Sequence, residues 1–291
     1  MTVVDERAMM IDLIREGGGQ RIVGPAAFTG EVRRALNLTW TLAYLEFRLR
    51  FFGSVLGYLW QLLRPLAMFG VYYVVFTQFL PLSKDVPYYP PMLLAGIMLY
   101  QFFGDATGAS VGAVLARENL VRKIHFPRIV IPFAVVVSAG LVLAVNMIAV
   151  GTFMFASGVP VRLNWLIAIP AVGLLVIYIS GLCMLLSSLF VRYRDVQPIW
   201  DVVLQGSFYA SPILYTIDRV PEKWQPLIMA NPMSTAAEQI RHSVFDPNAP
   251  SAADALGGPI YLLIPIAISF GVFVLGVWYF NKTAPAVAEE L

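Results

Sequence analysis

A few polar residues interrupt the long apolar stretches of this sequence, and the most notable are Asp105, Asp201 and Asn146. Polar groups within a bilayer are costly and usually serve a function or find a partner. Asp105 has no basic residue at helical spacing, so we expect it to face a protein or water-lined surface. Asp201 is close enough in sequence to Arg192 and Arg194 to pair with them, and Asn146 suits a hydrogen bond to a neighbouring helix. The three form no proton-relay series, which disfavours a proton-coupled carrier.

The residues that commonly bind metals or perform nucleophilic catalysis are scarce. The two histidines, His125 and His242, lie far apart, and Cys183 is the single cysteine and lies in an apolar run, as a small core residue does. None of the four lysines lies in a G-x-x-x-x-G-K-[ST] loop. We therefore expect no catalytic residue, no cofactor and no metal in this chain.

The composition indicates the element that must position these groups, which is the membrane helix. Hydrophobic residues make up 58% of the 291 positions and charged residues 13%, against roughly 25% charged residues in soluble domains. A helix needs about 20 mostly apolar residues to cross a bilayer. Six segments qualify, and the fifth is the least regular: 58–80, 91–114, 129–156, 163–191, 197–217 and 259–280. The sequence thus predicts an all-α integral membrane protein with six transmembrane helices.

The basic residues predict how these spans are oriented. Residues 1–35 are charged and lack the apolar stretch of a signal peptide, so we expect the first span to direct membrane insertion from a cytosolic N-terminus. With that orientation most of the 20 Lys and Arg residues fall on the cytosolic side. The prediction places the chain in the cytoplasmic membrane with both termini in the cytosol. A net charge of +2 without a basic run gives no indication of a nucleic-acid partner.

A second type of helix is predicted just before the first span, over residues 36–53. Its apolar residues recur at three- and four-residue steps: Leu38, Leu42, Leu45, Leu49 and Phe52. Arg48 and Arg50 flank this stripe, and Glu46 is spaced to pair with Arg50. An amphipathic helix with these features lies in the membrane interface with its cations toward lipid headgroups. The strict alternation over residues 47–51 also fits a strand, but it covers only five residues.

Two polar segments connect the spans. The cytosolic segment 115–128 has the length of a short helix, with Pro127 opening the next span, although an ordinary positively charged loop has the same composition. The external segment 218–258 contains the capping-box spacing Thr235 to Glu238, which predicts a short helix from there to about Phe245. Its apolar residues indicate that it re-enters the outer leaflet or packs over the spans. The remaining parts are a cytosolic extension, 1–35, the membrane domain, 54–282, and a tail, 283–291.

Aromatic residues make up 13% of the chain and concentrate in the first, second and fifth spans. Most are expected in interfacial belts or in helix packing. A subset on a pore surface would suit a sugar chain. The candidates for such a channel surface, together with Asp105, are Tyr72, Tyr73, Phe76, Phe208, Tyr209 and Tyr215.

Four motifs then resemble those of ABC type 2 permeases that export lipid-linked polysaccharides. The first is the run 48–66, where Ser54, Leu56, Gly57, Trp60 and Pro65-Leu66 match a family pattern. The others are 119–132, which is similar to the coupling segment of the family, then 190–196, and 209–215 combined with 231–233. The motifs occur in the family's order over most of residues 45–245. Ile129 replaces the glutamate that often follows the Phe-Pro-Arg of the family, a small departure.

This resemblance implies a homodimeric channel with two copies of a separate cytosolic ATPase subunit, which binds the ATP and Mg²⁺. It implies a glycan on a polyprenyl diphosphate, of the undecaprenyl or decaprenyl type, such as O-antigen, teichoic acid or galactan. Arg48, Arg50, Trp60 and Arg64 would meet the headgroup, because arginine binds phosphate oxygens in a bidentate manner. ATPase coupling would involve Glu118, Asn119, Leu120, Arg122, Lys123, His125, Phe126, Pro127 and Arg128. An external gate would involve Trp224, Asn231, Pro232, Met233 and Glu238.

Two other functions remain open from the sequence. One is a type 2 ABC exporter whose cargo is a drug or a lipid without glycan. The other is a polytopic glycosyltransferase acting on a carrier lipid, which would need a cluster of carboxylates or histidines at one membrane face. Asp105 and Asp201 are too isolated to form such a cluster.

Overall fold

The computed structural model describes residues 28–51, 57–79, 86–117 and 126–290, and all regular structure within them is helical. The longer helices are α2 (Phe28–Phe51), α3 (Gly57–Val74), α4 (Tyr89–Val111), α7 (Val130–Ala156), α8 (Ala168–Arg192), α9 (Val196–Ala210) and α13 (Leu263–Glu290). The shorter ones are η1 (Val75–Phe79), α5 (Ala113–Ala116), η2 (Leu163–Ile167), η3 (Ile217–Arg219), η4 (Glu222–Trp224), α10 (Gln225–Met229), α11 (Pro232–Ile240), η5 (Arg241–Phe245), α12 (Ala252–Leu256) and η6 (Pro259–Leu262). The predicted all-α class is confirmed.

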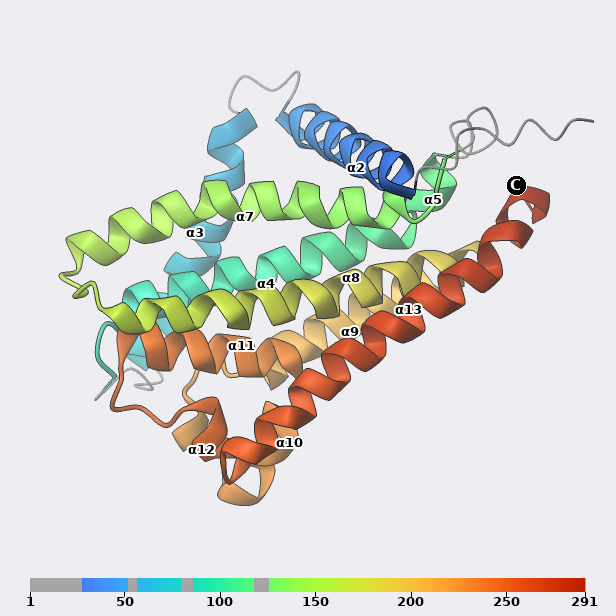
Figure 1. The fold of residues 1–291 in the computed structure, drawn as a ribbon. Coiled ribbons are helices and arrows are strands. Elements are labelled where there is room, and N and C mark those ends of the chain that lie inside the picture. The colour runs from blue at the N-terminus through green and yellow to red at the C-terminus, as the bar shows by residue number, and fades with distance from the viewer. Residues whose placement is uncertain (1–27, 52–56, 80–85, 118–125, 291) are drawn as a thin grey trace, which may run out of the picture.

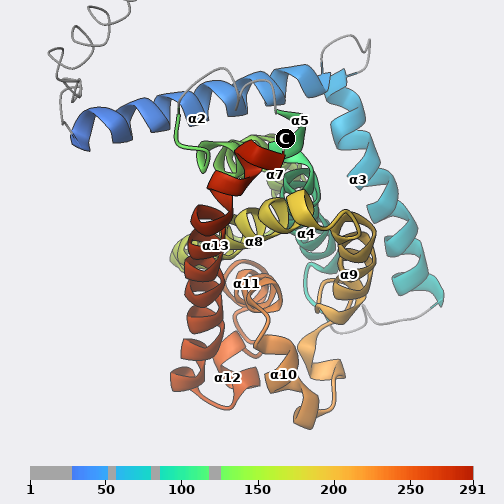
Figure 2. The same ribbon diagram turned by 90° about the vertical axis from the view of Figure 1, so that its right-hand side faces the viewer.

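Four helical stretches of the described residues are long and apolar enough to cross a membrane: Leu62–Phe79, Val130–Ala156, Leu163–Arg192 and Pro259–Thr283. They correspond to the predicted first, third, fourth and sixth spans. The predicted second span forms α4, which lies at the centre of the bundle beside α7 and α8 (Figures 1 and 2). Most of the α4 side chains are buried against neighbouring helices, whereas Gln101 and Asp105 are only partly buried.

The predicted fifth span differs most from the structure. The helix α9 ends at Ala210, so the expected continuous helix to residue 217 is wrong. Ser211 leaves the helix in an extended conformation, ahead of the buried Pro212. A residue before proline disfavours helical backbone, and proline cannot donate the hydrogen bond that the helix needs. Asp201 on α9 accepts a hydrogen bond from Gln197 at 3.2 Å, whereas Arg192 and Arg194 lie against aromatic rings.

Residues 47–51 are helical and not a strand, which confirms the predicted helix. This helix, α2, begins earlier than expected, at Phe28. It runs crosswise to α7 along the outside of the bundle (Figures 1 and 2). Ala43 is fully buried, while Trp40, Leu45 and Leu49 remain exposed. One face of α2 therefore packs on protein, and its position in the membrane interface stays a prediction.

The helices α8 and α13 cross with their backbones in close contact. A Cβ atom added at Gly181 of α8 would lie 2.6 Å from the backbone nitrogen and Cα of Phe273 on α13. A Cβ added at Gly276 would collide with the carbonyl oxygen of Gly181. Glycine at both positions therefore allows the two backbones to touch, as small residues do in membrane helix packing. Cys183, two residues after Gly181, is fully buried, which confirms that it is a core residue.

The segment predicted to be external, residues 218–258, forms a cap on one end of the bundle (Figure 1). The helices α10 and α12 lie at the opposite end of the molecule from α2 and the C-terminus (Figures 1 and 2). The helix α11 reaches back from the cap and packs against α8 and α4. Ser251 and Asp254 form a capping box at the start of α12, with the Ser251 hydroxyl accepting from the Asp254 N–H at 3.2 Å. Hydrogen bonds from Ser251 hold the pKa of Asp254 below its ordinary value.

Candidate functional site

A groove between α3, α4 and α9 brings together residues that are far apart in sequence. It has a volume of about 520 Å³. Its lining is Arg64, Pro65, Met68, Tyr72, Ile97, Tyr100, Gln101, Asp105, Leu204, Gln205, Phe208 and Tyr209. The three helices lie on the same side of the molecule in Figure 2. Each contributes residues at three- and four-residue spacing, so one face of every helix points into the groove.

Aromatic rings form much of the groove wall. Phe208 lies with its ring centroid 5.6 Å from Tyr72 and 4.9 Å from Tyr100, across three different helices. The Tyr100 hydroxyl lies 2.5 Å from the Ser207 Oγ and also donates to the carbonyl oxygen of Leu204, which ties α4 to α9. Rings held at these distances are offset or edge-on, the arrangement that aromatic pairs favour. Together with the amides of Gln101 and Gln205, they offer flat apolar faces beside hydrogen-bonding groups.

Four of the predicted channel residues line this groove: Tyr72, Asp105, Phe208 and Tyr209. The other three lie elsewhere. Tyr73 stacks on Phe69 at 5.7 Å, and Phe69 in turn packs against α7. Phe76 neighbours Tyr72 at 6.4 Å. The Tyr215 hydroxyl donates to the carbonyl oxygen of Ala210 at 3.0 Å and thereby closes the end of α9.

Cations gather at the Asp105 end of the groove. Arg64 belongs to the lining, and the guanidinium of Arg50 lies 3.9 Å from the Asp105 carboxylate. The expected pairing of Arg50 with Glu46 does not form, because Glu46 pairs with Arg117 instead. Arg48 is exposed, with its guanidinium 5.9 Å from the Tyr44 ring centroid, and Trp60 is exposed on α3. The Asp105 carboxylate thus meets cations supplied by α2 and α3, as its expected protein-facing position requires.

Most of the predicted coupling residues lie outside the described part of the chain: Glu118, Asn119, Leu120, Arg122, Lys123 and His125. Phe126 packs against a small apolar cluster that includes Ile131 and Phe280. Pro127 is exposed and accepts a hydrogen bond from the Val130 N–H at 3.0 Å, where α7 begins. The Arg128 Nη1 is buried without a hydrogen-bond partner among the residues that the structure covers.

The predicted gate residues belong to α11 and the segment before it. The expected capping box at Thr235 and Glu238 is wrong, and the helix begins three residues earlier, at Pro232. Asn231 caps it by accepting from the Met233 N–H at 3.1 Å, and proline at the first helical position is preorganised for a helix. The Thr235 hydroxyl donates instead to the carbonyl oxygen of Met229, at 2.5 Å.

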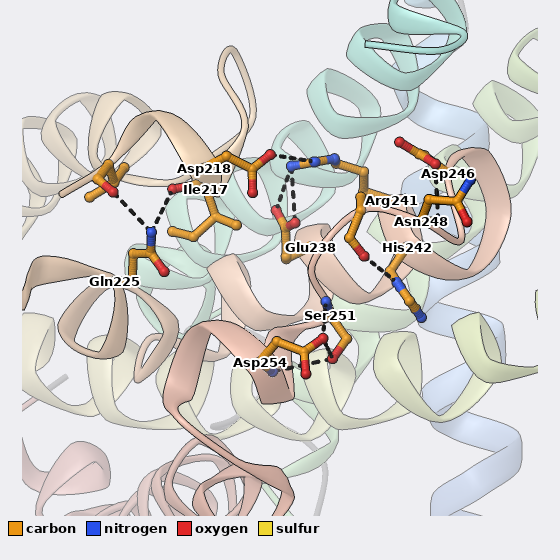
Figure 3. Close-up of polar contacts among 12 residues, drawn as sticks. Ile217, Asp218, Gln225, Glu238, Arg241, His242, Asp246, Asn248, Ser251 and Asp254 are labelled. Atoms are coloured by element: carbon orange, nitrogen blue, oxygen red, sulfur yellow. Dashed lines mark hydrogen bonds and ion pairs between the residues drawn. The ribbon is translucent and has the colours of Figure 1, made fainter. Parts of the chain in front are cut away.

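The side chain of Glu238 does not cap the helix but belongs to a buried cluster of charged residues (Figure 3). Arg241 lies 3.0 Å from Glu238 and 3.2 Å from Asp218, and both Glu238 and Arg241 are buried. Burial raises the pKa of Glu238 to about 7, the nearby Arg241 opposes this rise, and Asp218 adds to it. Trp224, by contrast, is exposed beside Lys223 at the outer face of the cap.

Sequence reasoning missed Tyr100, Gln101 and Gln205 in the groove and Arg241 in the cap. The groove residues carry a usable signal, since Gln101 with Asp105 and Gln205 with Tyr209 are spaced at i,i+4 on their helices. No signal for the Arg241 to Asp218 contact exists in local spacing, because it joins residues 23 positions apart. Within the described residues, no group of three or more His, Cys, Asp or Glu side chains is placed to hold a metal ion.

Helices long and apolar enough to cross a membrane, together with a groove lined by aromatic and polar side chains, indicate a membrane-embedded protein. The chain belongs to the ABC-2 type transporter family, which matches residues 37–245. This confirms the family that the four motifs indicated.

Named relatives cover most of the chain. An O-antigen export system permease protein RfbA of Klebsiella pneumoniae is 30% identical over 268 residues, which is 88% of this chain and all of the relative. The protein of the same name in Myxococcus xanthus is 27% identical, over 76% of this chain and 85% of its own length. The polysialic acid transport protein KpsM of Escherichia coli is 24% identical, over 68% of this chain and 78% of its own.

Proposed function

We propose that this chain is the membrane-spanning permease subunit of an ABC transporter that exports a polysaccharide across the cytoplasmic membrane. The observation that carries the proposal is the ABC-2 type family match over residues 37–245, together with relatives named for O-antigen export and polysialic acid transport. The groove supports it, because aromatic faces and amide groups suit the C–H faces and hydroxyls of sugars.

The membrane topology proposed for this function has six crossings with both termini in the cytosol. The largely buried α4 supplies the second crossing, and its polar residues Gln101 and Asp105 line the groove. With 15 residues, α9 is about 22 Å long, shorter than the roughly 30 Å hydrocarbon core, and the bends and turns of residues 211–216 follow it. The external cap and the interfacial α2 lie at opposite ends, as this topology requires (Figure 1).

The transport path in this proposal is closed by a second copy of the chain. The groove is open on one side, and α3 and α9 expose apolar side chains there and elsewhere on their surfaces, including Leu63, Met68 and Val202. Two copies facing each other would bury these residues and join their grooves into one channel. Asn231, Met233 and Glu238 would then belong to the external gate, and Trp224 to its exposed rim.

The energy source in the proposal is a separate ATPase, in two copies, that binds ATP and docks at residues 115–128. The substrate is a glycan on a polyprenyl diphosphate, of the undecaprenyl or decaprenyl type. Its headgroup is received by Arg48, with Arg50, Arg64 and Trp60 nearby. Arg48 is exposed, as are Arg50, Trp60 and Arg64, but Arg50 is engaged with Asp105, and arginine suits diphosphate oxygens.

Substitution of Arg48 tests this function in cells. Cells that lack the chain are expected to accumulate the polymer in the cytosol, and the wild-type chain restores its export. Arg48→Gln should lower export by about tenfold, the loss of one charge-assisted phosphate contact, with the permease still bound to its ATPase. The readout is surface and intracellular polymer, with Arg34→Gln at the other end of α2 as the control. Undiminished export by Arg48→Gln would exclude Arg48 from headgroup binding, and absence of cytosolic polymer in the deletion strain would exclude polysaccharide export.

A further inference from the structure

Two ion pairs fasten α2 to the cytosolic end of the central helix. Glu46 pairs with Arg117, which directly follows α5, and Arg50 pairs with Asp105 of α4 at 3.9 Å. Glu46 and Arg50 are four residues apart and therefore lie on the same face of α2. Their spacing would allow Glu46 and Arg50 to pair with each other, yet Glu46 pairs with Arg117 and Arg50 with Asp105.

The Glu46 and Arg117 side chains are shielded from solvent, with 21% and 19% of their surface exposed. An exposed surface pair contributes little, but removing one partner of a desolvated pair leaves a charge that water only partly compensates. Ala43, one turn before Glu46, is fully buried, so this face of α2 rests on the protein. Arg48 lies on the exposed side of the same turn. The ion pair therefore fixes the rotation of α2 and, with it, the direction of Arg48.

The position of Arg117 gives this pair its significance. Arg117 lies in the N-terminal part of residues 115–128, where the proposed ATPase docks. Between Arg117 and Asp105, the helix is interrupted at Gly112, which separates α4 from α5. The two ion pairs attach α2 on both sides of this interruption. A displacement of α5 relative to α4 consequently acts on α2 through Glu46, while Arg50 holds to α4.

We propose that Glu46 and Arg117 are positioning residues that couple the interfacial helix to the ATPase-docking segment. Movement of that segment on ATP binding pulls on Glu46 and turns α2, so that Arg48 and the headgroup it holds move toward the groove. The same motion that opens the bundle thus delivers the substrate. This inference rests on the proposed export function and adds a second route for force, from the docking segment to α2.

A charge exchange tests the pair in the assembled permease and ATPase complex. Glu46→Arg and Arg117→Glu alone should each lower export by about tenfold, the scale of a typical coupling between sites. The double exchange, which rebuilds the pair with reversed polarity, should recover export to within about threefold of wild type. The decisive readout is the number of ATP molecules hydrolysed per glycan exported. This ratio should rise in the single variants and return to the wild-type value in the double exchange. Arg34→Glu, a charge reversal at an exposed site of α2, serves as the matched control.

Each outcome decides the matter. Wild-type export by the single variants, or assembled single variants whose defect the exchange does not repair, overturns the ion pair as a coupling element. If the charge reversals do not assemble, Glu46→Gln, Arg117→Gln and their combination replace them. If both single variants and the double variant lose the same amount of export, the ion pair is supported. If the loss of export in the double variant is the sum of the two single losses, the pair is overturned. Failure of the wild-type complex to export any glycan would instead refute the proposed function, so the two failures are distinguishable.

Discussion

Gly181→Leu should abolish the native packing of α8 against α13. Any side chain at this position begins 2.6 Å from the backbone of Phe273, and a backbone cannot move aside as a side-chain tip does. Overpacking that forces backbone shifts costs about 3 kcal/mol, a large part of the stability of a typical domain. The expected result is little monodisperse protein after detergent extraction, and a lower unfolding temperature for what remains.

The same helix provides the control for this substitution. A Cβ added at Gly173 of α8 meets no atom within 4 Å, so Gly173→Leu adds the same side chain without a collision. It should extract and unfold like the wild type. Equal behaviour of the two variants would show that the close contact at Gly181 does not determine the packing.

Arg241→Ala should destabilise the external cap in a manner that depends on pH. The substitution leaves Glu238, which is fully buried, without the cation that lies 3.0 Å away. Breaking a buried pair by removing one partner typically costs about 3–5 kcal/mol. We expect a loss of this size at pH 8, measured as a lower unfolding temperature of the purified chain. Arg241→Lys, which keeps the charge, should lose much less.

The sign of the pH effect follows from the pKa of Glu238, which burial raises from 4.5 to about 7. A folded carboxyl with a raised pKa holds its proton where the unfolded one has lost it, so this group makes the protein less stable as the pH rises from about 4.5 to about 7. Without Arg241 the pKa rises further, because that cation lowers it. Arg241→Ala should therefore cost less at pH 5.5 than at pH 8. A cost independent of pH would mean that Glu238 does not become protonated in the variant, and Glu238→Gln combined with Arg241→Met should show no such dependence.

Much of the membrane architecture could be predicted because apolar length and periodicity are local signals. The helices α3, α7, α8 and α13 fall close to the predicted spans, and α2 has its predicted helical character. The failures have physical causes that a local pattern does not contain. Thr235 and Glu238 have the spacing of a capping box, but the Met229 carbonyl oxygen and the Arg241 guanidinium bind the two side chains instead.

The candidate site divides in the same way. Tyr72, Asp105, Phe208 and Tyr209 were predicted from residue type and do meet in one groove. Tyr73 has the same chemistry but points to α7, because neighbouring residues on a helix face directions about 100° apart. The partners of Arg50 and Glu46 required the fold, since α4 and α5 supply them from more than 50 positions away. Residue type was thus sufficient to propose candidates for the site. Which of them line the groove depends on how α2, α3, α4 and α9 pack together.

The central claim is that force from a separate ATPase enters this chain at residues 116–127. Its most direct test is to purify the chain with the candidate ATPase and measure association and ATP-driven transfer of diphosphate-linked glycan in liposomes. We predict that the wild-type chain binds the ATPase and transfers the glycan. Replacing residues 116–127 with an equally long Gly/Ser linker should abolish both activities without unfolding the bundle. Failure of the wild-type chain to bind the ATPase, or unchanged transfer by the linker variant, would contradict the account.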